Sequence, residues 1–367
     1  MIREEHLEVY DLTLTAKAPV FVGSGKSYVK KEYVFLDPRY ARVPDAQVVL
    51  MDEAKFFPML LERGLVDKYE RFMLGTQPDL YRFLTAECGF RLGDISAASR
   101  CVISAADALD GEHSLKEIHA FVRNGSGRAY VPGSSVKGAL RTVILTDMIL
   151  RENAVHAVPQ DKRRGIPEGE YLNTLALKRD REGRAADDAV NCFLRGVSIS
   201  DSAPVDDGCM MLAGKIDAGI DGKTHKINLC RECIRPGTKL HFKLTLDQSV
   251  LKGRVTAQRL TAAIQAFDRF YADTYLSRFT PPSGTARVSY DNALLLGGGA
   301  GFFSKTLTYP YLGQHAGLAA SINVLDRAFS RHRHQDDAGG GISPRTVKYA
   351  SCGGRLYPYG LCEVNIT

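Results

Sequence analysis

Residues 130–141 read Tyr130-Val-Pro-Gly-Ser-Ser-Val-Lys-Gly-Ala-Leu-Arg141. This stretch predicts the end of a strand, a tight turn at Pro132 and Gly133, and then a helix that runs to about Leu150. Ser134 or Ser135 is expected to be the N-cap, because a serine hydroxyl accepts a hydrogen bond from a free amide of the first turn. The face expected to be buried recurs at helical spacing and comprises Val136, Ala139, Leu140, Val143 and Ile144.

The charges of this helix are unusual for its start. Lys137 and Arg141 are i,i+4 neighbours and repel each other by about 0.2–0.5 kcal/mol. Both lie near a helix N-terminus, where the macrodipole disfavours cations. An anion would offset both costs, and free amides at a helix start bind phosphate well. The alternative is a solvated basic face on a scaffold helix.

Composition bounds the function only loosely. The 48 lysines and arginines exceed the 42 acidic residues by six, with a pI near 8.8, so any basic surface that binds nucleic acid must be local. No stretch of 18 apolar residues predicts a membrane span, and the charged start MIREEHLEVYDL predicts no secretion signal. We therefore expect the eight cysteines to be reduced thiols of a cytoplasmic protein.

Two more glycine-rich stretches carry lysines. Gly23-Ser24-Gly25-Lys26 lies between expected strands at 7–22 and 28–36. It is not a P-loop, because Val20 stands where the first glycine is needed and no helix follows, but its free amides could face a phosphate backbone. The third stretch, 296–306, contains Gly297, Gly298, Gly299 and Lys305.

The remaining pattern predicts an α+β chain. Residues 52–120 are expected to be a helical insertion between strands. Strands are expected at 196–202, 209–216, 225–230 and 239–246, with a turn at 231–238, and a helix at 256–275 carries Leu260, Ile264, Phe267 and Tyr271 on one face. We place residues 1–306 in the core and 307–367 in a C-terminal extension, with a second half-domain as the open alternative for the latter.

Other chemical motifs have weaker support. Cys230 and Cys233 form a lone CxxC without a second pair, and the tail cluster His332, His334, Asp336 and Asp337 is equally typical of a hydrophilic loop. We therefore predict no metal and no cofactor. Ser134-Ser-Val-Lys137 resembles an acyl-transfer S-x-x-K, but its two companion motifs are incomplete. The basic run at 161–164 is either a solvated loop or an RNA contact.

Five stretches together resemble the RAMP superfamily of CRISPR RNA-binding proteins, and come closest to the fifth subunits of type III-A (Csm) effector complexes. They are Pro19-Val-Phe-Val-Gly-Ser-Gly25, the stretch 130–141, Val197-Ser-Ile-Ser-Asp-Ser202, Arg231-Glu-Cys-Ile-Arg-Pro-Gly-Thr238 and Gly297-Gly-Gly-Ala-Gly-Phe-Phe-Ser-Lys-Thr306. The resemblance implies a ferredoxin-like (RRM-like) core. It also implies a subunit that binds crRNA, caps the filament at the crRNA 3′ side and assists crRNA maturation in antiviral defence.

The implied partners are crRNA, neighbouring backbone subunits of the Csm complex and, as a further candidate, target RNA. Related subunits cleave target RNA with an aspartate near the first glycine-rich region, but residues 23–34 contain none, so we expect no cleavage of target RNA. The expected RNA contacts are Gly23, Ser24, Gly25, Lys26, Gly133, Ser134, Ser135, Lys137, Gly138, Arg141, Gly297, Gly298, Gly299 and Lys305, with Phe302 or Phe303 as a stacking candidate.

Two other classes of function stay open. One is a metal-dependent ribonuclease acting on crRNA precursor, with Asp201 or the His/Asp tail cluster as its candidates. The other is an assembly subunit whose glycine loops contact only protein neighbours.

Overall fold

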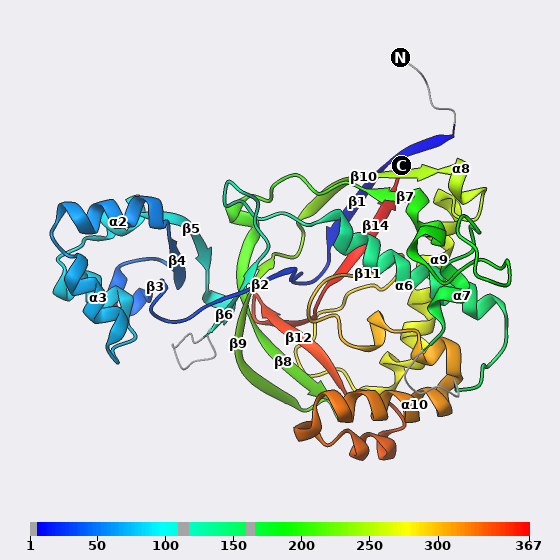
Figure 1. Ribbon diagram of the computed structural model, residues 1–367. Helices are drawn as coiled ribbons and strands as arrows, with labels where there is room; N and C mark the ends of the chain where they lie inside the picture. Colours follow the sequence, from blue (N-terminus) through cyan, green and yellow to red (C-terminus); the bar gives the residue numbers. More distant parts are fainter. Residues whose placement is uncertain (1–5, 109–116, 159–165) are drawn as a thin grey trace.

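The computed structural model describes residues 6–108, 117–158 and 166–367. The chain forms a large body and a smaller lobe that projects from one side of it, in blue and cyan in Figure 1. Each part has its own cluster of buried apolar side chains. The two clusters explain why the lobe stays compact although only a few chain segments join it to the body.

A five-stranded antiparallel sheet forms the centre of the body, in the order β11-β14-β1-β10-β7. These strands are β1 (Leu7–Ala16), β7 (Val197–Ile199), β10 (Lys239–Asp247), β11 (Ala293–Leu295) and β14 (Leu361–Ile366). Leu12, Leu14 and Ala16 alternate into the core, as expected for a strand with one buried face. Within residues 307–367, β14 pairs with β1 inside this sheet.

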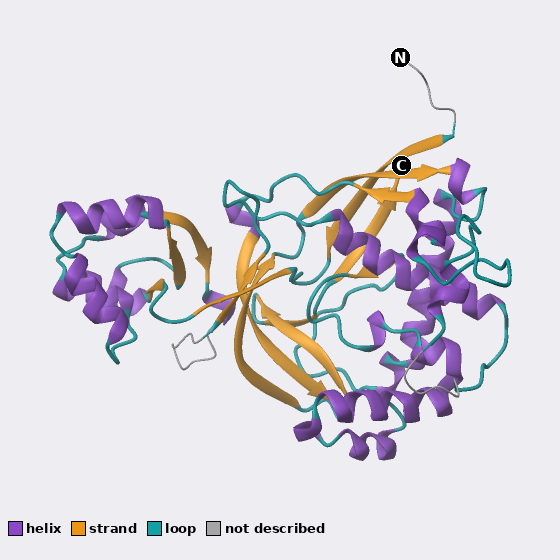
Figure 2. Ribbon diagram, in the orientation of Figure 1, coloured by secondary structure: helices purple, strands orange, loops and turns teal. Residues whose placement is uncertain are grey.

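Three long helices pack together beside this sheet, in purple in Figure 2. They are α6 (Gly133–Arg151), α9 (Ala257–Thr274) and α10 (Thr308–Ala328), the last interrupted at Gly313. The predicted apolar face of α9 is confirmed, because Leu260, Ile264, Phe267 and Tyr271 are all buried. The α6 face is confirmed too, with Ala139 only partly buried. Short helices are α1 (Pro38–Ala41), α7 (Glu168–Leu172) and α8 (Gln248–Leu251).

The second sheet is strongly curved, and its long hairpin β8–β9 runs along the body (Figure 1). Its path is β2 (Gly23–Tyr28), β6 (Ile118–Phe121), β9 (Thr224–Ile234), β8 (Met210–Gly219), β5 (Ser99–Ser104), β4 (Gln47–Met51) and β3 (Tyr33–Leu36), with β12 (Thr346–Cys352) on β8 and β13 (Arg355–Pro358) on β12. The strands predicted at 209–216 and 225–230 are confirmed, and they pair as this hairpin. The turn expected from Arg231 is wrong at its start, because β9 continues to Ile234.

The small lobe packs helices against β3, β4 and β5. Its helices are α2 (Glu53–Glu62), α3 (Val66–Leu74), α4 (Leu80–Arg82) and α5 (Leu92–Ala97), together with the short α1, whose Ala41 belongs to the lobe's apolar cluster. The single strand expected at 28–36 is wrong, since Glu32 N donates to Val29 O at 2.8 Å and closes a turn between β2 and β3. Helical structure also ends earlier than predicted, because 99–104 and 118–121 are strands.

The architecture thus combines helices with largely antiparallel sheets, in agreement with the expected α+β class. Within the described ranges, no helix has both the length and the apolar character that crossing a bilayer requires.

Candidate functional site

The first and third glycine-rich stretches meet in space. Gly298 N donates to Phe21 O at 2.7 Å, which joins the chain before β2 to the turn after β11. Gly297 has a φ of 79°, and a Cβ there would lie 2.1 Å from Phe21 O. Only glycine fits this position, because a side chain would meet both the left-handed backbone and a fixed carbonyl oxygen. The contact holds the two stretches at one edge of the body.

Arg231 of β9 lies beneath this contact. Its guanidinium stacks 5.1 Å from the Phe21 ring centre and 5.2 Å from that of Tyr359. The Tyr359 ring is fixed in turn, since its hydroxyl donates to Gly214 O at 3.0 Å. Gly299 completes the enclosure, because a Cβ there would lie 2.9 Å from Arg231 Nη1. The sequence therefore builds a rigid cradle around one cation.

The charge of Arg231 is not neutralised within this cradle. Its Nε and Nη1 atoms are buried and have no hydrogen-bond partner in the described chain. A buried polar group left without a partner costs about 1–3 kcal/mol, and a charged one costs more. A guanidinium donates well to phosphate and carboxylate oxygens. The arrangement thus leaves a cation whose buried donors are not satisfied by the described chain.

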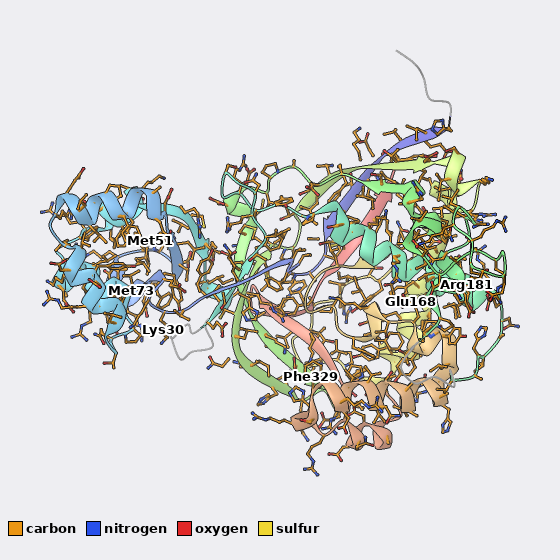
Figure 3. The ribbon with its side chains drawn as sticks, in the orientation of Figure 1. Lys30, Met51, Met73, Glu168, Arg181 and Phe329 are labelled. Atoms are coloured by element: carbon orange, nitrogen blue, oxygen red, sulfur yellow. The ribbon has the colours of Figure 1, made fainter. Side chains whose placement is uncertain are left out.

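A groove of about 570 Å³ opens beside Arg231. Figure 3 labels Phe329, one of its walls, where the ends of β8 and β12 approach α10. The groove is strongly positive, because five of its lining residues are lysine or arginine and one is aspartate. These charged residues are Lys215, Asp217, Arg231, Lys305, Arg345 and Lys348.

The cations of the groove differ in how far they are already paired. Lys348 Nζ lies 2.6 Å from Asp217 Oδ2, and Arg345 Nε lies 3.2 Å from Asp337 Oδ1. The Lys305 ammonium forms neither an ion pair nor a hydrogen bond with the described residues. Desolvation lowers the pKa of Lys305, and nearby Arg231 lowers it further. Lys305 and Arg231 are therefore the two cations of the groove that no carboxylate of the described residues pairs with.

The start of α6 is arranged differently from the prediction. The helix begins at Gly133, and neither Ser134 nor Ser135 caps it. Asp201 does so instead, because its Oδ1 accepts a hydrogen bond from Gly133 N at 2.8 Å. Gly133 is required here, since a Cβ would lie 2.1 Å from Ile199 O. The carboxylate that the helix dipole attracts thus comes from the segment after β7.

Both cations of α6 have protein partners. Lys137 Nζ donates to Val197 O at 2.7 Å, and desolvation lowers its pKa. Arg141 forms an ion pair with Glu168 at the start of α7, and Figure 3 labels this glutamate among the helices of the body. These two contacts stabilise the basic residues near the helix N-terminus, so their presence there does not require a bound anion.

Comparison with known proteins identifies the family. The sequence model of the RAMP superfamily matches residues 13–250. The CRISPR system Cms protein Csm5 of Streptococcus thermophilus is 30% identical over 339 residues, which cover 88% of this chain and 84% of that protein. The chain belongs to the RAMP superfamily, and within it to the Csm5 family.

Other relatives agree with this assignment. The Csm5 protein of Mycobacterium tuberculosis is 27% identical over 389 residues, which cover 98% of each chain. Among solved structures, a chain of a Csm–crRNA–target RNA ternary complex from a type III-A CRISPR-Cas system matches with a TM-score of 0.68 and 18% identity, over 97% of this chain and all of the other. Csm5 of T. onnurineus matches with a TM-score of 0.61 and 17% identity, over 96% and 99%. At these identities the two structures show a shared RAMP fold.

The predicted contact residues of this RAMP protein fall into two groups. Gly23, Ser24, Gly25 and Lys26 lie exposed on β2 and not in a loop, and Ser24 Oγ donates to Ala120 O at 3.2 Å. Together with Gly297, Gly298, Gly299 and Lys305 they lie on the side of Phe21 and Arg231. The second group lies on α6 against β7, the opposite edge strand of the five-stranded sheet from β11. It comprises Gly133, Ser134, Ser135, Lys137, Gly138 and Arg141.

Other residues considered from the sequence of this RAMP protein have the following contacts. Phe303 is a core residue, with its ring centre 4.7 Å from that of Tyr275, whereas Phe302 lines the groove. Within residues 6–108, 117–158 and 166–367, no group of three or more His, Cys, Asp or Glu residues could hold a metal ion. His334 Nδ1 instead pairs with buried Asp337 at 2.9 Å. The basic run 161–164 lies outside the described residues.

Sequence reasoning missed most of the groove. The motif at 231–238 predicts a turn at Arg231, whereas Arg231 lies on β9, and Tyr359, which stacks on it, lies far along the chain. Lys215 and Lys348 come from β8 and β12, which pair with each other. Alternation along these strands places Lys215 and Asp217 on one face, but only the strand pairing reveals which distant residues share it.

Proposed function

We propose that this chain is a crRNA-binding subunit of a type III-A Csm effector complex. In this proposal it caps the complex at the crRNA 3′ side and assists crRNA maturation in antiviral defence, and it does not cleave target RNA. Its partners are crRNA, the neighbouring backbone subunits and target RNA. Membership of the Csm5 family and the likeness to a chain of a Csm–crRNA–target RNA complex support this role.

One observation carries the proposal. Arg231 and Lys305 are unneutralised cations in a positive groove, next to the contact between two glycine-rich stretches. A phosphate backbone supplies the anions that these groups lack, and glycines let the RNA approach the main chain closely. Such contacts hold RNA without reading its sequence, which suits a subunit that must accept any guide.

The other contacts are proposed from the sequence with less structural support. Lys26 on β2 is exposed and extends the positive side beyond the groove. On α6, the exposed residues Ser134 and Gly138 are free to face a phosphate, whereas Lys137 and Arg141 would have to share or leave their protein partners. We therefore rank the groove above the start of α6 as the main RNA contact.

The element order supports the finer description of the fold. Four strands of the five-stranded sheet and two helices follow one another along the chain in the order β1, α6, β7, β10, α9 and β14. Within the sheet, the four strands lie side by side in the order β14-β1-β10-β7. We propose that these six elements form the ferredoxin-like core, with β11 added at its edge.

The proposal is tested by filter binding of labelled crRNA across a salt series. Lys305→Ala should weaken binding about tenfold and make the logarithmic salt slope less steep by about 0.7, the value for one phosphate contact on single-stranded RNA. Lys55→Ala is the matched control, because this lysine is 56% exposed on α2 of the small lobe and pairs with Asp52. Equal affinities and slopes for the two variants would refute the groove as the RNA site.

Incubation with labelled crRNA precursor, with and without divalent metal, tests the ribonuclease alternative. Under our proposal the RNA is bound and stays intact in both samples. Metal-dependent cleavage that survives repurification would overturn it.

A further inference from the structure

The small lobe contains a second, chemically different cavity. It has a volume of about 180 Å³, which equals the liquid volume of about six water molecules. Four aromatic rings line it, together with two basic and two acidic side chains. These residues are Tyr33, Phe35, Tyr40 and Tyr81, then Lys30 and Arg39, then Asp37 and Asp79. The remaining walls are Pro78 and Leu80.

The floor and the mouth of this cavity differ. Tyr33 and Asp37 are buried, at 3% and 5% exposure, so they form the floor. Tyr40 is 69% exposed at the mouth, and the Arg39 guanidinium lies 5.2 Å from its ring centre. Arg39 is itself held by Asp37, whose Oδ1 accepts from Arg39 Nε at 3.0 Å. An exposed aromatic ring with a fixed guanidinium on it offers a flat stacking surface.

The cavity adjoins a second depression next to the end of β2. A shallow depression lined by Val29, Lys30, Lys31, Pro78 and Glu117 shares Lys30 and Pro78 with it. Val29 directly follows β2, the strand that carries Lys26. Lys31 is anchored at the lobe, because its Nζ donates to Met73 O at 2.8 Å, and Figure 3 labels Lys30 and Met73 at the base of the lobe. An RNA strand that contacts Lys26 and continues past the end of β2 would therefore reach this cavity next.

We propose that this aromatic cavity binds one unstacked nucleobase of the RNA strand whose backbone contacts the body. The inference rests on the proposed function and adds a second kind of contact to it. Aromatic walls accept the face of any base. The carboxylates of Asp37 and Asp79 disfavour a phosphate inside the cavity, whereas Lys30 and Arg39 suit the phosphates on either side of the base.

The experiment separates base stacking from phosphate binding. The full-length protein is titrated with a single-stranded RNA and with copies of it that each carry one abasic position. The wild-type chain should lose affinity about tenfold when the base at one position is missing, since stacking on an aromatic side chain contributes on this scale. Tyr40→Ala should weaken binding of the intact RNA by a similar factor and remove the sensitivity to that position.

Controls keep the two proposals distinguishable. Tyr40→Phe retains the ring and should behave as the wild type, and Tyr40→Ala should leave the salt slope unchanged, whereas Lys305→Ala should reduce it. If Tyr40→Ala binds every RNA as the wild type does, or if it changes only the salt slope, the base-binding inference is wrong while the groove stands. If Tyr40→Ala impairs only assembly with other subunits, the cavity binds protein, and the inference fails as well. Equal affinities and equal salt slopes for Lys305→Ala and Lys55→Ala would refute the groove as the RNA site and leave the base-binding cavity unaffected.

Discussion

The contact between the two glycine-rich stretches can be broken with a single methyl group. In Gly297→Ala the new Cβ would lie 2.1 Å from Phe21 O, a backbone atom that cannot rotate away. The residue would also keep a φ of 79°, which costs a non-glycine residue about 1–2 kcal/mol. Separation of the stretches then breaks the hydrogen bond from Gly298 N to Phe21 O, worth about 0.5–1.5 kcal/mol. We expect a total loss of about 1.5–3.5 kcal/mol in the free energy of unfolding.

Gly301→Ala is the matched control for this substitution. Gly301 has a φ of 88°, and a Cβ there meets nothing within 4 Å. It carries the same backbone penalty without the collision, so we expect a loss of about 1–2 kcal/mol. The difference between the two variants isolates the contact itself.

Urea denaturation followed by far-UV circular dichroism measures both values, because the chain contains no tryptophan. Equal free energies of unfolding for Gly297→Ala and Gly301→Ala would refute the reasoning. A variant that loses stability but keeps its crRNA affinity would show that the site does not depend on this contact.

Two further predictions concern carboxylates. Asp201→Ala removes the cap of α6 and should lower the free energy of unfolding by about 1 kcal/mol, whereas Ser134→Ala should leave it nearly unchanged in the same urea titration; the opposite ranking would restore serine as the cap. Burial raises the pKa of Asp268 to about 7, while its Oδ2 accepts from Ala293 N at 2.7 Å. An unfolded aspartate titrates near pH 4, so the folded chain holds the additional proton between about pH 4 and 7, and this group stabilises the fold less as the pH rises. Urea titrations across this window should show Asp268→Asn gaining stability relative to the wild type, by at most about 1.4 kcal/mol per pH unit; a constant difference would contradict the raised pKa.

Local patterns predicted the elements whose partners are close in sequence. The apolar face of α9 follows from helical spacing, and the two strands β8 and β9 follow from alternation on both sides of a short turn. The break between β2 and β3 is not evident from the sequence because strand-forming tyrosine and valine residues lie on both sides of the turn. Glu32 closes that turn through its own side chain, which accepts from Val29 N at 2.8 Å.

The candidate site depended on contacts that sequence spacing cannot show. The charges of Lys137 and Arg141 near a helix start indicate that both side chains need partners. In the structure these partners are Val197 O for Lys137 and Glu168 for Arg141. Arg231 shows the reverse case. Nothing in its neighbourhood in the sequence indicates a cradle, because Phe21 and Tyr359 come from near the two ends of the described chain.

The pairing of β1 has a consequence for how the chain reaches its fold. Leu14 lies opposite Leu240 on one side and Val364 on the other, so both edges of β1 close only through very distant segments. Contacts of this kind form slowly, since a long loop must be ordered before they contribute any stability. During refolding β1 therefore exposes unpaired backbone and apolar side chains for longer than the local hairpin β8–β9. An open edge of this kind invites pairing with another chain, which makes aggregation through β1 the main competitor of productive folding.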